Sequence, residues 1–358
     1  MPKVERMRAA VLHAPGDLRV EEVPAPQPAA GEVLLRVARS GVCGSDVPRI
    51  LEGAAHRYPI VLGHEFAGTV AAVGEGVGPE ILGRRAACAP LLPNFADPQC
   101  ARGNYSLGKG YGFIGSRQPG GFAEYVAMPL RNAVLLPEGL DLGAAALLEP
   151  ITVGLHAVNI MDFTPGRPVA VTGVGTIGIL LVQGLRALGA GSITVLDVDP
   201  ARLAQARELG ADQAFDSRVP DADRAAVEAL GEPGFDFVFE TAGVPAAEIL
   251  ALKLAGPRGR VMFVGTPHQP LTLQPAEFEL MNRKELMVQG SWMNYSAPFP
   301  GWEWEFGARL LADGRVRTAG LVDRVLPLAE AGQVPALLRK RGELKGKLLL
   351  DCAREGVR

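Results

Sequence analysis

Residues 168–188 read PVAVTGVGTIGILLVQGLRAL, and this stretch decides the fold of the second half of the chain. The apolar, β-branched run Pro168–Thr172 has the composition of a buried strand. The apolar residues from Ile177 to Leu188 extend over helical length and indicate a helix. A glycine-rich turn, Gly173-Val174-Gly175-Thr176-Ile177-Gly178, separates the two. We therefore expect a strand, a tight turn and a helix in that order.

The spacing Gly173-x-Gly175-x-x-Gly178 is the pattern that holds the pyrophosphate of a dinucleotide. The first glycine permits the tight turn, the second lets the backbone approach the phosphates, and the third lets helix and strand pack closely. The phosphates then face the positive end of the helix, beside Thr176 and Ile177. The chain has 44 glycines, so the pattern by itself fits a purely structural turn equally well.

Asp197 favours the dinucleotide interpretation, and NAD over NADP. It ends the next expected strand, Ser192–Leu196, 19 residues after Gly178. A carboxylate there accepts hydrogen bonds from the adenosine ribose hydroxyls and repels a 2′-phosphate. The alternative role for Asp197 is an N-cap of the helix at Pro200, but Asp199 fills that role better and leaves Asp197 free. Arg202 is the remaining expected cofactor-binding residue.

The alternation of strands and helices continues beyond this unit. We expect a helix at Pro200–Leu209 and strands at Phe235–Glu240 and Arg260–Val264. Repeated βα units of this kind form a doubly wound parallel sheet, the Rossmann fold. We assign residues 152–290 to this domain.

The residues before position 151 have a different texture. Met7–His13, Gly31–Ser40 and Phe66–Val73 are β-prone runs bounded by Gly, Pro or Asp. Prolines at positions 15, 24, 26 and 28 prevent long helices there. We expect an antiparallel, β-rich domain over residues 1–151. The aromatic segment Trp292–Trp304 brings the chain back to this domain, so we assign residues 291–358 to it as its C-terminal part. The fold class is therefore α/β with two domains.

Length and composition exclude several classes of protein. A chain of 358 residues exceeds one ordinary core, and its 48% hydrophobic and 21% charged residues are typical of a soluble globular protein. A net charge of -3 offers no large attractive surface to nucleic acid or anionic lipid. Glycines interrupt the apolar stretch Pro168–Leu185, so we expect no membrane span. The first residues have no apolar run behind them and do not resemble a secretory signal.

The four cysteines lack the spacing of a disulfide framework, which favours a reducing cytoplasm. They are Cys43, Cys88, Cys100 and Cys352. The apolar strand expected at Leu286–Gly290 suits pairing across a two-fold axis, so we expect a homodimer or homotetramer.

Two polar loops of the first domain carry potential metal ligands. Cys43 lies in the segment GVCGSD, and His64 and Glu65 lie in the segment GHEFAG. Glu149 lies at the domain junction, where a cleft is expected. A thiolate, an imidazole and carboxylates can hold a tetrahedral zinc and leave one position open for substrate. Any one such residue is more often an ordinary packed side chain than a metal ligand, and Glu149 also suits the N-terminus of a helix. The presence of both loops in one domain nevertheless favours a metal site.

The pattern Gly63-His64-Glu65-x-x-Gly68, with Gly74 and Val77 beyond, resembles the zinc signature of the medium-chain dehydrogenase/reductase superfamily. The whole chain is similar to the polyol dehydrogenase branch of that family. The resemblance implies a GroES-like catalytic domain beside the Rossmann domain. It also implies one catalytic zinc per chain held by Cys43, His64 and Glu149, with Glu65 as an alternate ligand or a close second carboxylate.

The resemblance further implies a zinc-dependent oxidoreductase that moves a hydride from a secondary hydroxyl of a small-molecule polyol to NAD. Ser45 would hydrogen-bond the reacting oxygen and pass its proton outward, and Asp46 would orient His64 or a neighbouring loop. A zinc-free enone reductase would not need the three ligands together, and a metal-storing relative would not need Asp197.

Four longer segments resemble polyol-phosphate dehydrogenases within this branch, and they comprise residues 43–50, 113–117, 149–156 and 290–296. They imply a substrate similar to galactitol 1-phosphate, with a free polyol such as sorbitol as the alternative. The basic residues Arg49, His56, Arg57 and Arg117 lie near the metal motifs and suit a phosphate, although each singly also suits an ordinary surface position.

Two departures from the family pattern stand out. Many relatives bind a structural zinc through four cysteines, where this chain has Asn94, Asp97, Cys100 and Gly108. One thiol cannot hold a closed tetrahedral site. Some relatives also end a proton relay at a histidine five residues after the first ligand. That position is Pro48 here, so protons must leave by another route.

Overall fold

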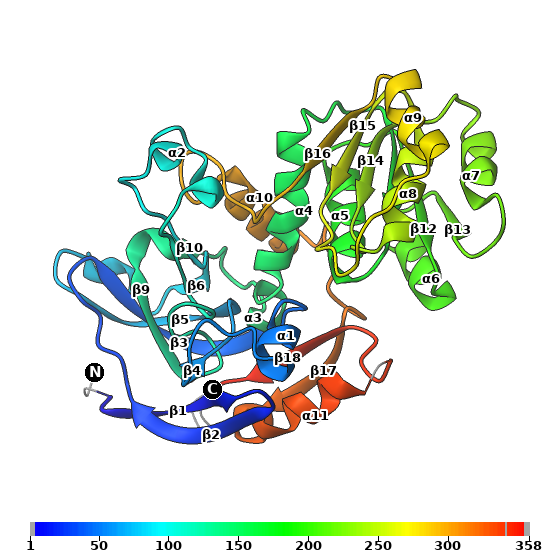
Figure 1. Cartoon of the computed structure of the whole chain (residues 1–358). Coiled ribbons are helices and arrows are strands. Elements are labelled where there is room, and N and C mark those ends of the chain that lie inside the picture. Colours follow the sequence, from blue (N-terminus) through cyan, green and yellow to red (C-terminus); the bar gives the residue numbers. More distant parts are fainter. Residues whose placement is uncertain (1–3, 341, 354–358) are drawn as a thin grey trace. The chain divides into compact units, whose positions relative to one another are not determined.

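The computed structural model describes residues 4–340 and 342–353 (Figure 1). By internal packing, the chain divides into two units. Unit 1 comprises Met1–Glu149, Tyr295–Gly314 and Thr318–Arg358, and unit 2 comprises Pro150–Asn294 and Arg315–Arg317. The main divisions lie two and four residues from the expected boundaries after positions 151 and 290.

The short excursion Arg315–Arg317 was not expected from the sequence. The backbone N–H of Arg317 donates to Gln183 Oε1 at 2.8 Å, and Gln183 Nε2 donates to the Arg317 carbonyl at 3.2 Å. These two bonds attach the segment to unit 2.

Unit 1 is built on a seven-stranded sheet with the order β10-β6-β5-β3-β18-β17, in which β9 also pairs with β3. Its strands are β3 (Glu32–Gly41), β5 (Glu65–Val73), β6 (Arg85–Cys88), β9 (Tyr125–Pro129), β10 (Ala133–Leu135), β17 (Val322–Pro327) and β18 (Lys347–Asp351). A three-stranded sheet has the order β2-β1-β4, and a two-stranded sheet pairs β7 with β8. These strands are β1 (Arg6–Ala14), β2 (Asp17–Pro24), β4 (Ile60–Val61), β7 (Leu91–Leu92) and β8 (Gly112–Phe113).

The strand pairs formed within residues 1–149 of unit 1 are antiparallel, as expected. The pair β17–β18 is parallel, which corrects the expectation of a purely antiparallel domain. The chain between these strands passes through η4 (Leu328–Gln333) and α11 (Val334–Arg339). Such a crossover returns the chain to the same end of the sheet, which parallel pairing requires.

Alternating apolar residues bury one face of the central strand β3. Val33, Leu35 and Val37 are fully buried, and Phe66 of the neighbouring strand and Phe122 join the same core. A strand places every second side chain on the same face, so this alternation fixes which residues face the core. The remaining helical segments of unit 1 are short, apart from α10. They are α1 (Asp46–Leu51), η1 (Pro79–Ile81), α2 (Pro98–Ala101), η2 (Tyr105–Leu107), η3 (Leu130–Asn132), α3 (Leu142–Ala145) and α10 (Trp302–Ala312).

Unit 2 is a six-stranded parallel sheet with the order β13-β12-β11-β14-β15-β16. This is the doubly wound order expected from the sequence, and it reverses direction between β11 and β14. The strands are β11 (Pro168–Thr172), β12 (Ser192–Asp197), β13 (Gln213–Asp216), β14 (Phe235–Glu240), β15 (Ala255–Phe263) and β16 (Met287–Gly290). The helices are α4 (Leu148–Ile160), which begins at the end of unit 1, α5 (Thr176–Ala187), α6 (Pro200–Glu208), α7 (Ala222–Leu230), α8 (Pro245–Leu254) and α9 (Pro275–Arg283).

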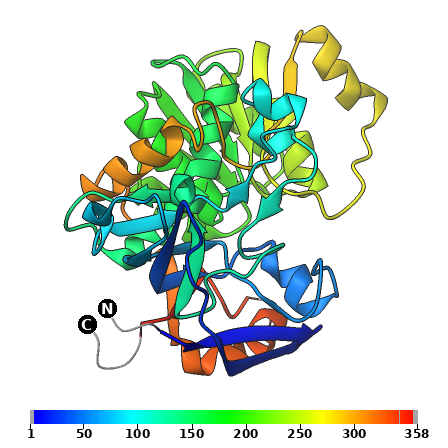
Figure 2. The same ribbon diagram turned by 90° about the vertical axis from the view of Figure 1, so that its left-hand side faces the viewer.

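The edge formed by α9 and β16 is exposed. Figure 2 shows the gold helix α9 at the margin of unit 2, and none of its residues is buried. All four residues of β16 are exposed as well, including the apolar Met287 and Val288. No helix among the described residues is both long and apolar enough to cross a membrane.

Candidate functional site

Three strands of unit 1 meet where the potential metal ligands lie. Gly41, the last residue of β3, is paired with Glu65 of β5 and with Leu349 of β18. Cys43 follows β3 by two residues and His64 directly precedes β5, so the ends of these strands bring the side chains together. One ligand atom from each of Cys43, His64 and Glu65 lies within 4.8 Å of the others. We call these three residues the metal cluster.

Glycines beside the metal cluster make room for it. A Cβ atom at Gly41 would collide with the Glu65 carboxylate. Gly63 has a φ of +95°, and a Cβ there would collide with the ring of Phe122. The glycine that precedes each ligand loop is therefore needed for the close approach of the ligands.

Asp46 holds the loop and the histidine of the metal cluster. Its carboxylate is fully buried and accepts a hydrogen bond from the Cys43 backbone N–H at 3.1 Å and from Arg49 Nη1 at 3.2 Å. Its Oδ1 lies 3.7 Å from Nδ1 of His64. This places Nδ1 on the carboxylate side and leaves Nε2 as the ring nitrogen for a metal. The ring of Phe113 contacts the imidazole edge to face, with centroids 5.6 Å apart.

Lys347 forms a buried ion pair with the metal cluster. Its Nζ lies 2.7 Å from Oε1 of Glu65, and both side chains are almost inaccessible to solvent. Burial by itself lowers the pKa of Lys347, but the negative charges of Glu65, Cys43 and Glu149 outweigh it, and the pKa is raised. Lys347 is not among the site residues expected from the sequence, because its only local signal is a lysine at the start of the apolar strand β18.

The charge of the metal cluster suits a divalent cation. Burial by itself lowers the pKa of His64. The negative charges of Asp46, Cys43 and Glu149 outweigh burial and raise the pKa above its ordinary value, to about 10. The site thus has a strong excess of negative groups. In addition, Oε2 of Glu65 is buried and has no hydrogen-bond partner among the described residues. Such an oxygen costs about 1–3 kcal/mol, and a metal ion bound there would remove that cost. Sulfur, nitrogen and oxygen donors at this spacing fit Zn²⁺.

Glu149 lies beside the metal cluster but does not belong to the group within 4.8 Å. It is buried in the first turn of α4, and its charge raises the pKa of His64, Lys347 and Tyr295. The structure thus brings Cys43, His64 and Glu65 within ligand spacing, because Glu65 directly follows His64, whereas Glu149 comes from a separate helix. The expected set of Cys43, His64 and Glu149, with Glu65 as the alternate ligand, stays a prediction.

A group of basic residues lies on the same unit, beside Ser45. Nη1 of Arg49 donates to Ser45 Oγ at 2.9 Å, and the Arg49 guanidinium also contacts Asp46. The pKa of His56 is lowered, first by burial and then by the positive charges of Arg117 and Arg49. These three basic side chains are therefore near one another, and we call Arg49, His56 and Arg117 the basic cluster. Arg57, the fourth expected phosphate ligand, is exposed next to His56.

The loop that carries Arg117 packs against the metal cluster. A Cβ at Gly115 would collide with the backbone at Gly63 and His64, so this glycine permits the close approach. The Arg117 guanidinium lies over the ring of Tyr111, 4.7 Å from its centroid. Stacking of this kind fixes the orientation of the cation while its N–H edges stay available.

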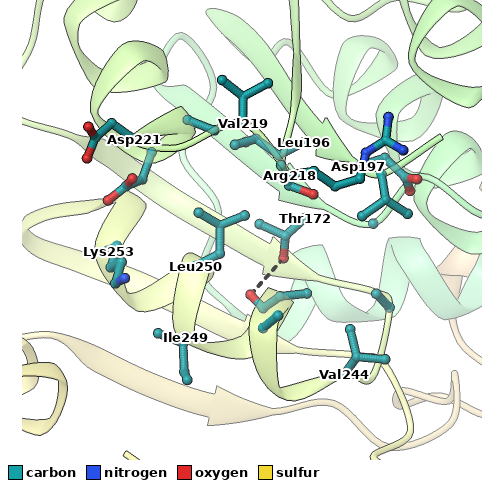
Figure 3. Close-up of a pocket in the computed structure, with 18 of the residues that line it drawn as sticks. Thr172, Leu196, Asp197, Arg218, Val219, Asp221, Val244, Ile249, Leu250 and Lys253 are labelled. Atoms are coloured by element: carbon teal, nitrogen blue, oxygen red, sulfur yellow. Dashed lines mark hydrogen bonds between the residues drawn. The ribbon is translucent and has the colours of Figure 1, made fainter. Parts of the chain in front are cut away.

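Unit 2 has a cavity of about 550 Å³ at the carboxyl ends of β11, β12, β13 and β14 (Figure 3). It lies where the strand order of the sheet reverses, which is where dinucleotides bind in this fold. Gly173 and Asp197 line it, together with Arg218 and Lys253. The other expected cofactor-binding residues do not line this cavity, and they are Gly175, Thr176, Ile177, Gly178 and Arg202.

The glycine turn has the properties expected of a phosphate-binding turn. Gly173 has a φ of +84°, and a Cβ at Gly178 would collide with the Gly173 carbonyl. A Cβ at Gly175 would meet only Arg202 Nη1, at 4.0 Å. The surface of Gly175 is therefore open, and a guanidinium stands beside it. Thr176 begins α5, and its half-buried backbone is at the positive end of that helix.

Asp197 is more constrained than the sequence indicated. Its Oδ2 accepts a hydrogen bond from the Val174 backbone N–H at 2.7 Å, and its Oδ1 accepts one from the Asp199 N–H at 2.8 Å. The side chain therefore also closes the glycine turn, a role that the sequence spacing did not indicate. Asp199 is the N-cap of α6, as expected, and accepts from the Ala201 N–H. Each Asp197 oxygen keeps a second acceptor position toward the cavity.

Two family profiles match the sequence. The profile described as "Alcohol dehydrogenase GroES-like domain" matches residues 29–138, and that described as "Zinc-binding dehydrogenase" matches residues 176–309. The first match lies within unit 1, and the second begins in unit 2 and extends to residue 309, in the segment Tyr295–Gly314 of unit 1.

Three proteins illustrate the similarity. Galactitol 1-phosphate 5-dehydrogenase of Escherichia coli (strain K12) is 45% identical over 318 residues, which cover 88% of this chain and 92% of that protein. Sorbitol dehydrogenase of Bacillus subtilis (strain 168) is 33% identical over 323 residues, 89% of each chain. The crystal structure of galactitol-1-phosphate dehydrogenase from Escherichia coli matches with a TM-score of 0.91 at 42% identity, covering 96% of this chain and all of the other. A zinc-binding dehydrogenase from Sinorhizobium meliloti 1021, bound to NADP, matches with a TM-score of 0.88 at 29% identity, covering 97% and 99%.

The fold, the metal cluster and these similarities agree with one another. The chain belongs to the zinc-binding dehydrogenases of the medium-chain dehydrogenase/reductase superfamily, in their polyol dehydrogenase branch, and is a zinc-type, NAD(P)-dependent dehydrogenase.

Proposed function

We propose that this protein oxidises a secondary hydroxyl of a polyol phosphate to a ketose phosphate, with NAD as the hydride acceptor. The observation that carries the proposal is that the metal cluster and the basic cluster share unit 1 and are connected through Asp46, whose carboxylate accepts hydrogen bonds from Arg49 and from the Cys43 backbone N–H. The similarity to galactitol 1-phosphate 5-dehydrogenase supports the same substrate class.

Cys43, His64 and Glu65, with Glu149 beside them, would hold the zinc. The glycine turn, Asp197 and Arg202 would hold the NAD. When bound, zinc supplies Lewis acidity to the substrate oxygen, and NAD supplies the acceptor for the hydride. We infer one zinc per chain and a cytoplasmic homo-oligomer, in which the exposed strand β16 is suited to pair with a second copy.

Ser45 would move the proton of the substrate hydroxyl. Its side chain is exposed, and the N–H of Arg49 donates to its Oγ. This bond occupies one lone pair, so the other can accept the proton while the serine releases its own to water. An exposed serine delivers the proton directly to solvent, so Pro48 at the position of the relay histidine is no obstacle.

The phosphate would bind the basic cluster. Arg117 is exposed, and within residues 4–340 and 342–353 no carboxylate lies within ion-pair distance of it. A guanidinium held by an aromatic ring presents two parallel N–H groups, which match two phosphate oxygens.

The test is the ratio of kcat/KM for a polyol phosphate to kcat/KM for the same free polyol, measured with NAD and with NADP. We expect a ratio of at least about tenfold, or roughly 1.4 kcal/mol, and faster turnover with NAD. Arg117→Ala should bring the ratio toward one. Arg131→Ala is the matched control, because Arg131 also stacks on an aromatic ring, that of Phe95, but belongs to neither cluster. A wild-type ratio near one would reject the phosphate and leave a free polyol, the alternative that the similarity to sorbitol dehydrogenase supports.

A further inference from the structure

We propose that the ion pair between Asp216 and Arg218 selects NAD over NADP in the cavity of unit 2. The inference rests on the proposed NAD cofactor and names the residues that would set the preference. Neither residue belongs to the glycine turn, and neither was recognised in the sequence.

Arg218 lies beside the carboxylate expected to bind the ribose. The parallel strands β12 and β13 align Asp197 with Asp216, and the Ser217 N–H donates to the Asp197 carbonyl at 3.0 Å. Asp197 and Arg218 both line the cavity, and Figure 3 shows them at the same side of it. A guanidinium next to the ribose site is the usual counter-ion of the 2′-phosphate of NADP.

In this protein that guanidinium is already occupied. Its Nε lies 2.9 and 3.2 Å from the two carboxylate oxygens of Asp216, and its Nη2 lies 2.6 Å from Oδ2. The backbone N–H of Arg218 also donates to Oδ1 at 2.9 Å. The side-chain bond to Arg218 is the largest cause that lowers the pKa of Asp216, to about 2. Asp216 is therefore charged throughout the neutral range and holds Arg218 through a bidentate pair.

The other charged groups beside the cavity of unit 2 do not cancel its negative charge. Asp199 caps α6 and lies 3.8 Å from the Arg202 guanidinium. The charged side chains that line the cavity are Asp197, Asp221, Asp223, Glu277, Arg218 and Lys253, so the net charge of the lining is 2 − 4 = −2. A 2′-phosphate brings about −1.5 to −2 charges to an edge that is already negative. The uncharged 2′-hydroxyl of NAD avoids this repulsion and donates to Asp197.

We therefore expect substitutions of Asp216 and of Arg218 to change the affinity for a 2′-phosphate in opposite directions. Asp216→Asn removes a negative charge and releases the guanidinium, so affinity for a 2′-phosphate should rise. Arg218→Ala leaves Asp216 unpaired beside the cavity, so affinity for a 2′-phosphate should fall further.

The experiment compares binding of 5′-AMP and 2′,5′-ADP, which differ only in the 2′-phosphate, by calorimetry with the full chain. We expect the wild type to bind 2′,5′-ADP at least tenfold more weakly than 5′-AMP. Asp216→Asn should reduce that ratio at least fivefold, Arg218→Ala should increase it, and the double variant should lie near the wild type. Asp212→Asn is the matched control, because Asp212 pairs with Arg186 at 2.6 Å in the same unit but does not line the cavity. Its ratio should stay within twofold of the wild-type value.

The two proposals fail in different ways. A wild type that binds 2′,5′-ADP as tightly as 5′-AMP would reject the NAD preference itself. If the wild type discriminates but both variants keep its ratio, or shift it in the same direction, the ion pair does not select the cofactor. Binding needs neither zinc nor polyol, so a wrong substrate assignment would leave these outcomes unchanged.

Discussion

At the scale of single residues, Lys347 is the clearest case of a side chain whose role depends on one distant partner. Its ammonium and the Glu65 carboxylate are buried together, 2.7 Å apart. Removing one member of a buried pair leaves the other charge without compensation, which costs about 3–5 kcal/mol. We therefore expect Lys347→Met to lower the free energy of unfolding of the metal-free protein by about that amount, measured by urea denaturation.

Lys345→Met is the control for this change, because Lys345 is exposed two residues earlier in the chain. It should alter the free energy of unfolding by less than about 0.5 kcal/mol. If Lys347→Met and Lys345→Met lowered the free energy of unfolding equally, the Glu65–Lys347 pair would not contribute more to stability than an exposed lysine does.

Lys347 also illustrates which site residues a sequence can predict. Cys43, His64 and Glu65 were found because two short loops combine glycines with ligand residue types. Lys347 was not found because its partner is 282 positions away, and one lysine before an apolar strand has no local signature. Asp197 was identified by its position at the end of β12, but its bonds to the glycine turn depend on the fold and could not be read from spacing.

At the scale of elements, side-chain hydrogen bonds hold together the lobe of residues 94–110, which lacks a set of four cysteines. Asp97 accepts hydrogen bonds from the backbone N–H of Gln99 at 2.8 Å and of Lys109 at 3.1 Å. Asn94 Nδ2 donates to the Lys109 carbonyl at 3.1 Å. The Gln99 bond, followed by the Lys109 bond, lowers the pKa of Asp97. A carboxylate and an amide thus make the cross-links that thiolates and a metal make in many relatives.

This lobe should open at low pH. The folded pKa of Asp97 is below its ordinary value of 3.8. Its contribution is therefore complete above about pH 4 and is lost as the pH falls through the folded pKa. We expect lower amide protection factors in residues 97–109, relative to the unstructured chain at the same pH, below that pH and already at pH 7 in Asp97→Ala. Glu138→Ala, a change of an exposed carboxylate in the same unit, should leave this exchange unaltered. Slow exchange in Asp97→Ala would mean that other contacts close the lobe.

The elements predicted best were those with complete patterns. The β11–α5 and β12–α6 units carry buried strands, a glycine turn and a capped helix, and they formed within a residue or two of the expected bounds. The β13 strand was missed because all four of its residues are only partly buried at the sheet edge, which leaves no clear apolar pattern. The parallel β17–β18 pair was missed because strand direction depends on the crossover and not on composition.

At the scale of the whole molecule, the distribution of thiols predicts the metal content. Cys43 is in the metal cluster, whereas Cys100 is a single thiol in the lobe and Cys88 and Cys352 are buried separately. We expect elemental analysis of metal-loaded protein to find about one zinc per chain. Cys43→Ala should reduce this to near zero and abolish activity without unfolding the protein. Cys100→Ala should retain one zinc, and two tightly held zincs in the wild type would contradict the assignment.

Unit 1 is formed by three separate stretches of the chain, so its parts are synthesised at different times. Glu65 leaves the ribosome 282 residues before Lys347, which is roughly 14–56 s at about 5–20 residues per second. All of unit 2 is translated in that interval, and the strand β18, which lies between β3 and β17 in the central sheet of unit 1, is among the last segments to appear. The nascent chain therefore has an incomplete sheet and an uncompensated carboxylate in the metal cluster until translation is almost finished. We therefore expect the catalytic unit to close late in synthesis, and premature termination between Glu149 and β18 would yield a chain that contains every expected ligand but lacks a finished site.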